Sequence, residues 1–316
     1  MMFREQRDQI AEDISRARSK RQAYNDKTYT TLKWSNGVAY MLFELDEETK
    51  SSFKKAAKLW MDDTCINFTE YNPMIRPKPP KPEHYLLVIK GPGCSSDLGR
   101  KSDWDKQFER QTTETNNNYN LTYDYGSVMH YGSSSVTANK RTPVMVAKDK
   151  DYTETLGSDI ISFYDLLMMN MLYNCVDTCK AVDTKCQNDG FPHPRDCSKC
   201  ICPSGYGGKL CETRPEGCGS ELVAEDQWNT LEAEQDGSKA SDQRDGFMRC
   251  NYWIKAPDDR KVEVEILELR DMVAVDGCKH AGVEIKTHSD KRLTGYRKKC
   301  VLELKGLSDS PHFSMT

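Results

Sequence analysis

The sequence predicts a multidomain protein with an α+β domain, a small disulfide-rich module and an all-β sandwich, in that order. One observation is length, because 316 residues are enough for two or three domains. Another is the distribution of the 13 cysteines: two precede residue 170 and eleven follow it, a pattern typical of disulfide-stapled extracellular modules. The last is the alternation of apolar and charged residues near the C-terminus, which indicates an antiparallel sandwich.

Composition argues against two kinds of partner. The formal net charge of −4 offers no basic face for a phosphate backbone, so we expect no nucleic-acid partner. No run of residues is long and apolar enough to span a bilayer, so we expect no membrane span.

The N-terminus does not match the extracellular character of the cysteines. Residues 1–8 are highly charged and no apolar stretch follows them, so no secretory signal peptide is recognised. Either secretion is non-standard or the chain lacks its beginning. Residues 18–21 read RSKR, the type of site that proprotein convertases cut, which favours a propeptide remnant over residues 1–21 ending at Arg21. The alternative is a solvated run of charge.

The first unit is expected over residues 22–175. Its early elements are a strand at Val38–Phe43 and an amphipathic helix at Asp46–Met61. The helix is predicted from apolar residues at i, i+3, i+4 and i+7, which are Phe53, Ala56, Ala57 and Trp60.

The later elements of this unit surround a stiff loop. Five prolines lie in residues 73–82, which excludes regular structure there, and a strand is expected at His84–Ile89. A final helix is expected to begin with Ser158 as its N-cap and to run to about Tyr173, which places Cys175 at its end.

The second unit, residues 176–212, contains too little apolar material for a core and must be held by disulfides. Six cysteines lie between Cys179 and Cys211, and residues 200–208, CICPSGYGG, resemble the ending of an EGF-like module. A zinc knuckle at Cys197 and Cys200 is the competing interpretation, but it would leave the other cysteines without a role.

The third unit covers residues 218–316 and resembles a CUB domain. Val262, Val264 and Ile266 alternate with charged residues, and Val283 and Ile285 repeat the pattern. The residues that carry the resemblance are 281–286 (AGVEIK) and 294–297 (TGYR). The chain stops soon afterwards, which leaves open a truncated sandwich without its last strand and therefore with an exposed edge.

Residues 123–132, YDYGSVMHYG, match the Met-turn of a metzincin zinc endopeptidase. Such an enzyme also needs HExxHxxGxxH, in which two His one helical turn apart and a third His bind zinc and the Glu acts as base. The six His residues are His84, His130, His193, His280, His288 and His312, and no two of them are four apart. No GxSxG elbow, P-loop or GxGxxG fingerprint offers another chemistry.

The order of these features resembles the secreted astacin-family zinc metalloendopeptidases, particularly the nematode type with EGF-like and CUB domains. The segments that carry the resemblance are Trp34, Trp60 with residues 63–68, Gly93-Cys94 with residues 98–100, residues 123–132 and residues 172–175. The resemblance implies a metzincin-like fold, secretion as a zymogen, zinc as cofactor, and extracellular protein or peptide substrates or ligands.

The resemblance also implies roles for individual residues. Tyr131 matches the tyrosine that binds zinc at rest and then stabilises the transition state, and Met129 matches the apolar base beneath the metal. His130 is expected to be a hydrogen-bonded core residue rather than a zinc ligand. The sequons at Asn67 and Asn120 are candidate glycosylation sites.

The family pattern has one gap in this chain. The zinc-binding segment would fall between Arg100 and Lys101, which are adjacent here, so an internal deletion near residues 100/101 is expected. The family's disulfide pattern implies the pairs Cys65–Cys175, Cys179–Cys197, Cys186–Cys200, Cys202–Cys211, Cys218–Cys250 and Cys278–Cys300. Cys94 is left unpaired because its family partner would lie in the absent segment, although a purposeful free thiol is the alternative.

The expected function follows from this gap. The lineage is that of a zinc metalloendopeptidase, a hydrolase, but the chain as written lacks the zinc ligands and the catalytic Glu, so we expect it to bind no zinc and to be inactive, as a splice form or an incomplete sequence. The first alternative is a secreted, non-catalytic pseudoprotease that binds partners through its EGF-like and CUB modules. The second is a redox-linked or dimeric structural protein that uses Cys94.

Overall fold

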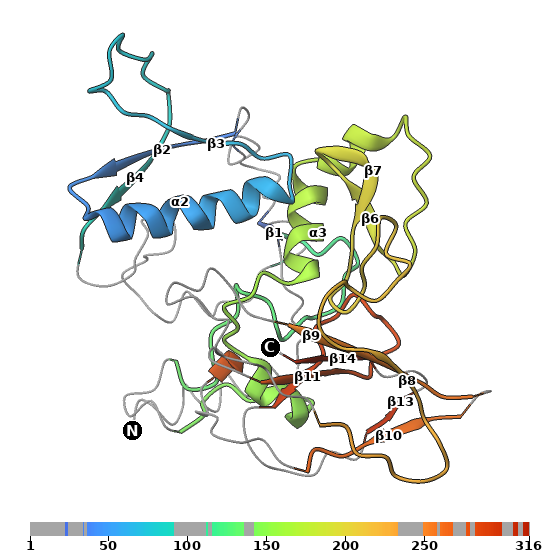
Figure 1. Ribbon diagram of the computed structural model, residues 1–316. Coiled ribbons are helices and arrows are strands. Elements are labelled where there is room, and N and C mark those ends of the chain that lie inside the picture. Colours follow the sequence, from blue (N-terminus) through green and yellow to red (C-terminus); the bar gives the residue numbers. More distant parts are fainter. Residues whose placement is uncertain are drawn as a thin grey trace.

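The computed structural model describes residues 23–24, 34, 37–91, 112, 116–135, 142–232, 249–257, 260–267, 276–278, 282–298, 306–308 and 312–315. Arg21, Cys94 and the junction of Arg100 with Lys101 lie outside these residues, so the structure does not bear on the predictions made for them. Figure 1 shows a small sheet with a helix across it, a helix beneath that leads to the cysteine-rich segment, and a group of C-terminal strands on the opposite side.

The N-terminal sheet is parallel and has the order β3-β2-β4. Its strands are β2 (Val38–Phe43), β3 (Phe68–Glu70) and β4 (Leu86–Ile89), and α2 (Glu47–Asp62) is the crossover from β2 to β3. The predictions of β2 and of the helix are confirmed, and Asp46 is the N-cap because its side chain accepts from the Thr49 N–H at 2.8 Å. The predicted strand at His84–Ile89 is shorter than expected and begins at Leu86.

The apolar face of α2 is narrower than its periodicity predicts. Ala57 is buried and Phe53 is half-buried, with its ring 4.9 Å from that of Tyr40 on β2, whereas Ala56 is exposed. The helix therefore packs on the sheet along one thin stripe. The proline-rich loop at residues 73–82 contains no helix or strand, as predicted.

The last helix of the first unit, α3 (Phe163–Leu172), starts later than predicted. Its N-cap is Ser162, which forms a capping box with Asp165: each side chain accepts from the other's backbone N–H, at 3.2 and 3.0 Å. The predicted N-cap, Ser158, is wrong because its hydroxyl instead accepts from the Ile160 N–H and from Arg297 Nη1.

The core around α3 joins segments that the sequence analysis assigned to separate units. Leu121, Tyr164 and Leu167 pack with Phe191 and Ile201 of the cysteine-rich segment, and Leu293 from the C-terminal part joins the same cluster. Apolar burial therefore links all three segments.

Several short elements complete the first part of the chain. They are β1 (Ala23–Tyr24), which is antiparallel to β5 (Asn116–Asn117), and the 3-10 helices η3 (Lys150–Thr155) and η4 (Cys175–Cys179).

The cysteine-rich segment, residues 179–211, is a hairpin held by disulfides. Its strands are β6 (Phe191–His193) and β7 (Asp196–Ile201). The disulfides in the structure are Cys65–Cys175, Cys179–Cys197, Cys186–Cys200, Cys202–Cys211 and Cys218–Cys250. These are five of the six pairs that the resemblance implies; the sixth includes Cys300, which lies outside the described residues.

The C-terminal strands form a five-stranded sheet of order β12-β11-β14-β9-β8 and a two-stranded pair of β10 with β13. Their bounds are β8 (Glu221–Val223), β9 (Cys250–Lys255), β10 (Val262–Val264), β11 (Val283–Lys286), β12 (Tyr296–Lys298), β13 (Gly306–Ser308) and β14 (His312–Met315), with the 3-10 turn η6 at Asp276–Cys278.

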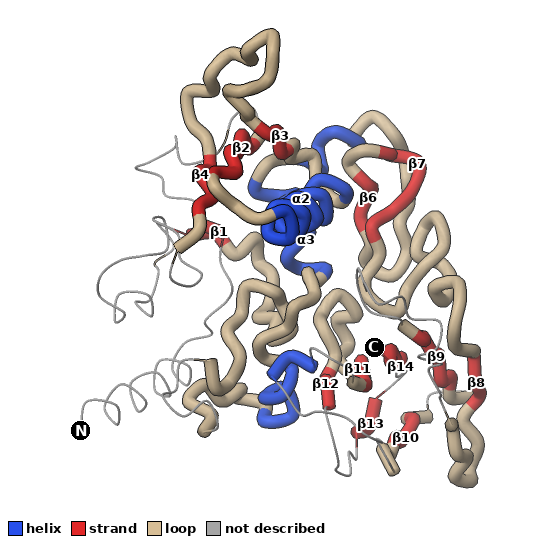
Figure 2. Tube along the Cα trace, turned by 60° about the vertical axis from the view of Figure 1, so that its left-hand side comes forward, coloured by secondary structure: helices blue, strands red, loops and turns tan. Residues whose placement is uncertain are grey.

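Strand β14 lies in the centre of the C-terminal sheet, antiparallel to both β11 and β9, and the described edges are β12 and β8. The possible absence of a last sandwich strand stays a prediction. All four residues of β11, Val283 to Lys286, are buried, although alternation predicted charged side chains in solvent. The charged side chains of β11 contact Ser204 of the cysteine-rich segment, and Glu284 also contacts Arg297 of the neighbouring strand β12. Figure 2 shows β11 between β12 and β14.

The Cys65–Cys175 disulfide closes the longest loop of the five, with a sequence separation of 110 residues. Replacing both cysteines by Ala is expected to lower the free energy of unfolding by about 4 to 5 kcal/mol, because the unfolded chain gains the entropy of that loop. The matched control is the Cys202–Cys211 pair, with a separation of 9 residues, for which the same model expects about 2 to 3 kcal/mol. Chemical denaturation measures both, and equal losses would contradict the loop-length argument.

Candidate functional site

The Met-turn segment, residues 123–132, is a tight turn held by its own polar side chains. The His130 N–H donates to the Ser127 carbonyl at 3.1 Å, and the Met129 N–H donates to the Ser127 hydroxyl at 3.1 Å. The Gly126 N–H donates to Asp124 at 3.1 Å. Ser127 and Asp124 are fully buried, so the turn is built on polar groups that have left solvent.

Asp165 connects this turn to α3. Its carboxylate accepts hydrogen bonds from the Ser127 hydroxyl, from the Val128 N–H at 3.0 Å and from the Ser162 N–H at 3.0 Å. One buried side chain therefore caps the helix and fixes the start of the turn. Sequence reasoning missed it, although an acid three residues after a serine is the signature of a capping box.

Thr294, which lies two residues before strand β12 of the C-terminal sheet, contacts the buried side of the turn. Asp124 accepts from the Thr294 N–H at 3.3 Å and from its hydroxyl at 3.2 Å. A Cβ on Gly126 would lie 2.3 Å from the Thr294 side chain, so only glycine allows this approach.

A second contact follows at the end of the turn. Asp276 accepts from the Ser133 hydroxyl at 2.9 Å, and from the Ser134 N–H at 2.9 Å and hydroxyl at 2.7 Å. A Cβ on Gly132 would lie 2.8 Å from Asp276, so backbone and side chain are in direct contact here as well.

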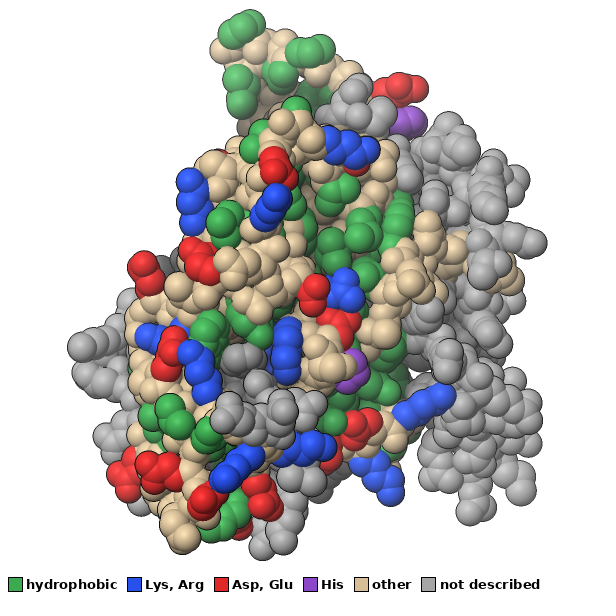
Figure 3. All heavy atoms as spheres, turned by 90° about the vertical axis from the view of Figure 1, so that its right-hand side faces the viewer, with side chains coloured by type: hydrophobic (Ala, Val, Ile, Leu, Met, Phe, Trp, Pro, Cys, Tyr) green, Lys and Arg blue, Asp and Glu red, His purple; other side chains and the backbone are tan. Residues whose placement is uncertain are grey.

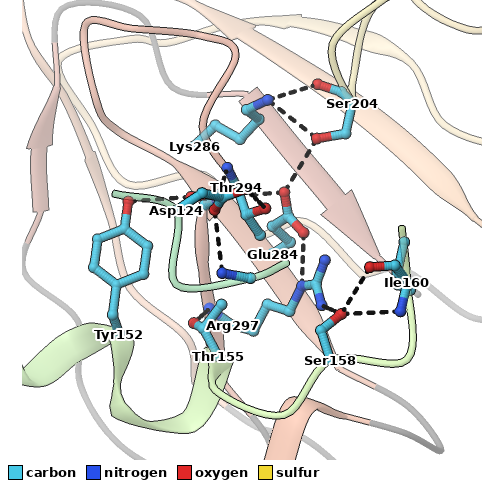
Figure 4. Close-up of polar contacts among 12 residues, drawn as sticks. Asp124, Tyr152, Thr155, Ser158, Ile160, Ser204, Glu284, Lys286, Thr294 and Arg297 are labelled. Atoms are coloured by element: carbon cyan, nitrogen blue, oxygen red, sulfur yellow. Dashed lines mark hydrogen bonds and ion pairs between the residues drawn. The ribbon is translucent and has the colours of Figure 1, made fainter. Parts of the chain in front are cut away.

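A buried ion pair lies at the centre of this interface (Figure 4). Arg297 Nε donates to Glu284 at 2.8 Å, and the two side chains are 5% and 4% exposed. Arg297 also donates through Nη1 to Ser158 at 2.6 Å and through its backbone N–H to the Thr155 hydroxyl at 2.9 Å. Strand β12 is thereby joined to the segment that precedes α3.

Glu284 keeps its charge in this environment. Burial by itself would raise the pKa of its carboxyl, but Arg297 and Lys286 hold that pKa below its usual value. The Gly295 N–H and the Ser204 hydroxyl also donate to it, at 3.1 and 3.3 Å.

Lys286 extends the network to the cysteine-rich segment. Its ammonium donates to the Ser204 carbonyl at 3.0 Å and to the Ser204 hydroxyl at 3.1 Å, and it is 2% exposed. Burial lowers the pKa of Lys286 to about 8, against the opposing effect of Glu284 and Asp124.

A row of aromatic rings covers one side of the interface. Tyr125 stacks on Tyr152 with centroids 4.8 Å apart, and Tyr152 lies 4.4 Å from Tyr296 of β12. The Tyr152 hydroxyl donates to the Thr294 carbonyl at 3.1 Å. Burial raises the pKa of Tyr296 to about 12, and the hydrogen bond to Asp149 adds to this rise.

The residues predicted to form the catalytic floor lie on the opposite, open side of the turn. Met129 is 75% exposed and Tyr131 is 51% exposed. His130 is half-buried, with its Nδ1 2.6 Å from the Tyr131 carbonyl and its ring at the edge of Tyr123. The expectation of a core position for His130 is therefore wrong, while its hydrogen bond was expected.

The described residues do not form a zinc site. Zinc is held by three or four N, S or O ligands that converge on one point. Within the described ranges, no group of three His, Cys, Asp or Glu side chains converges in this way. Tyr131 therefore has no set of partner ligands beside it among the described residues.

The two candidate glycosylation sites are accessible. Asn67 and Asn120 are both exposed, and the Asn67 side-chain oxygen accepts from Arg195 Nη2 at 2.9 Å.

None of the helices in the described part of the chain has the length and apolar character needed to cross a membrane.

Comparison with known proteins identifies the class of the first part of the chain. Residues 26–106 and 101–174 match the Astacin family of peptidases. The chain therefore carries an astacin-type peptidase domain, and the resemblance read from residues 123–132 is confirmed at the level of the family.

Individual relatives are nematode proteins. The chain is 37% identical over 333 residues to zinc metalloproteinase nas-31 of Caenorhabditis elegans, which covers 89% of this chain and 52% of the relative. It is 42% identical over 185 residues to zinc metalloproteinase nas-25 of the same species, covering 57% of this chain and 46% of the relative. The chain thus spans about half the length of these curated relatives.

The Asp165 contacts generate a stability prediction. Asp165→Ala is expected to lower the free energy of unfolding by about 3 kcal/mol, because it removes a helix cap and leaves buried donors of the Met-turn unpaired. The control is Asp46→Ala, which removes only the cap of α2 and is expected to cost about 1 kcal/mol. Denaturant titration compares the two, and equal losses would show that Asp165 is only a cap.

Lys286 generates a pH prediction. Between pH 8 and about 9.5 the unfolded chain keeps the proton of Lys286 while the folded protein releases it, so the free energy of unfolding rises with pH. The Lys286→Met variant should lose this rise, and the exposed Lys185→Met should retain it. Urea titrations at several pH values provide the measurement; a rise that persists in Lys286→Met would contradict the assignment.

Proposed function

We propose that this chain derives from a secreted astacin-type zinc metalloendopeptidase and that, with this sequence, it does not hydrolyse peptide bonds. The observation that carries the proposal is a Met-turn without its histidines: residues 123–132 are present, whereas no two of the six His residues have the spacing of a zinc-binding helix. The exposed positions of Met129 and Tyr131 agree with a turn whose usual covering element is not supplied by the described residues.

The chemistry of a zinc peptidase explains why a chain of this lineage can lack peptidase activity. In this class of site, three imidazoles hold zinc, zinc lowers the pKa of a bound water to about 7, and a glutamate takes the proton. Tyr131 can stabilise an oxyanion by donating a hydrogen bond from its hydroxyl, but it can neither generate nor position the nucleophile.

Two features of the comparisons support an internal deletion near residues 100/101. The family match consists of two segments that meet and overlap at residues 101–106. The alignment with nas-31 extends over 333 residues, more than the 316 of this chain, although 89% of the chain is covered. The relative therefore contains positions that have no counterpart here. Cys94, for which the resemblance leaves no partner, agrees with the same deletion.

The remaining architecture is part of the same proposal. We assign residues 1–21 to a propeptide remnant, 22–175 to the peptidase-like domain, 176–212 to an EGF-like module and 218–316 to a CUB domain. Three disulfides within residues 179–211 support the EGF-like assignment, and the antiparallel pairing of β12, β11, β14 and β9 supports the CUB assignment, although β8 pairs with β9 in parallel. The disulfides also favour an oxidising, extracellular location, in which Asn67 and Asn120 would be glycosylated.

A non-catalytic binding protein is the second candidate. The specific observation in its favour is the buried network of Glu284, Arg297 and Lys286, which joins the C-terminal sheet to both other segments. Such an arrangement presents composite surfaces to partners.

The test of inactivity uses the purified full chain. We expect zinc well below one equivalent by elemental analysis and no cleavage of a quenched fluorescent peptide. Inserting the corresponding nas-31 segment between Arg100 and Lys101 should restore both zinc binding and cleavage. Near-stoichiometric zinc with cleavage by the uninserted chain would refute the proposal. Sequencing of transcripts across the codons of Arg100 and Lys101 distinguishes a splice form from true loss.

A further inference from the structure

A cavity of about 460 Å³ lies where the three segments of the protein meet. The peptidase-like segment contributes Asp63 and residues 160–163, the cysteine-rich segment contributes His193 and residues 199–202, and the C-terminal part contributes Arg249 and Arg297. The volume is in the range of ligand-binding pockets, and a position between domains is common for such sites.

The charges that line the cavity are unequal. Four cations face it, Lys199, Arg249, Arg292 and Arg297, against two carboxylates, Asp63 and Glu284. Figure 3 shows the face on which the cysteine-rich segment lies, where Lys and Arg side chains occur among hydrophobic and acidic ones.

Two of the four cations are already paired. Arg297 is bound to Glu284 at 2.8 Å, and Arg292 is bound to Asp290 at 2.9 Å. Lys199 lies 4.0 Å from Asp196, with both side chains about half exposed, which is a weak contact. Arg249 makes no hydrogen bond or ion pair with any residue that the structure describes, although Glu284 attracts its charge and Arg297 repels it at longer range. Lys199 and Arg249 are therefore available to an incoming anion.

Asp63 and Lys199 attract each other electrostatically, but the described contact of the Asp63 carboxylate is with His193 and not with Lys199. Asp63 Oδ1 lies 3.6 Å from His193 Nε2, and His193 Nδ1 accepts from the Arg195 N–H at 3.1 Å. With Nδ1 occupied as an acceptor, the neutral ring carries its proton on Nε2 and directs it at Asp63. This partner holds Asp63 at one side of the cavity.

One wall of the cavity is apolar. Ile160, Ile161, Phe163, Leu166 and Ile201 all line it. A ligand that fills the space must therefore pair an anionic group with an apolar one, because burying hydroxyls against these side chains would leave hydrogen bonds unmade. This composition favours a peptide over a sulfated sugar.

We propose that this cavity binds an acidic peptide, with one carboxylate between Lys199 and Arg249 and a neighbouring apolar side chain against Ile160 and Phe163. The proposal does not depend on peptidase activity, because none of these residues belongs to the Met-turn segment. The cavity would be the binding surface of the non-catalytic binding protein proposed above, and all three segments contribute to it.

The experiment measures fluorescence anisotropy of a labelled Leu-Glu-Leu-Asp-Gly peptide with the oxidised full chain. The matched neutral peptide, Leu-Gln-Leu-Asn-Gly, should bind at least about tenfold more weakly when both peptides carry a C-terminal amide, since its charge-assisted contacts are lost. The double variant Lys199→Gln/Arg249→Gln should weaken binding of the acidic peptide by a similar factor, and Lys199→Gln alone by less. The control Lys185→Gln removes an exposed lysine of the same segment outside the cavity and should not change binding.

Circular dichroism of each variant establishes that it is folded. The single Lys199→Gln change alters a half-exposed side chain, so it tests the proposal even if the double variant fails to fold. Equal binding of the acidic and neutral peptides, or no binding of either, would overturn the proposal. Tighter binding of a sulfated heparin hexasaccharide than of the acidic peptide, with loss in Lys199→Gln, would overturn the choice of a peptide ligand.

Discussion

The buried ion pair of Arg297 with Glu284 is the contact on which the arrangement of the three segments depends. Both side chains have left water, and transferring a charge into the interior is costly unless it is paired and hydrogen-bonded. Each partner meets this requirement by contacts across segment boundaries, Arg297 with Ser158 and Glu284 with Ser204. Docking removes this pair from water, and the hydrogen bonds to Ser158 and Ser204 offset part of the desolvation cost. The polar groups of the other two segments are therefore what allows the pair to be buried.

This docking gives the Met-turn two different sides. On its buried side the turn is held by three carboxylates, those of Asp124, Asp165 and Asp276, which also connect it to α3 and to the C-terminal part. On its other side, Met129 and Tyr131 are exposed to solvent. The buried side holds the turn in place, while a metzincin zinc site needs ligands that no His in this sequence supplies with the required spacing. A well-formed turn is therefore evidence of family resemblance and does not by itself make a catalytic site.

Local periodicity predicted several elements well. The strand Val38–Phe43 and the helix capped by Asp46 were found because their signals lie within the element itself. The start of α3 was misplaced because Ser158 and Ser162 both precede an apolar run, and only Asp165 together with the contact from Arg297 distinguishes them. Strand β11 was misjudged for a similar reason, since alternation cannot reveal that a second segment covers its charged face.

The sequence by itself determined the lineage, the spacing of the cysteines and the gap in the zinc motif, because each of these is a property of residue order. The tertiary structure alone decided which polar groups are buried, where β14 pairs, and which cations from distant segments meet at one cavity. Burial and long-range pairing depend on contacts between residues more than a hundred positions apart, such as Thr155 with Arg297. No local pattern encodes such contacts, and the cost of desolvating charge makes them decisive.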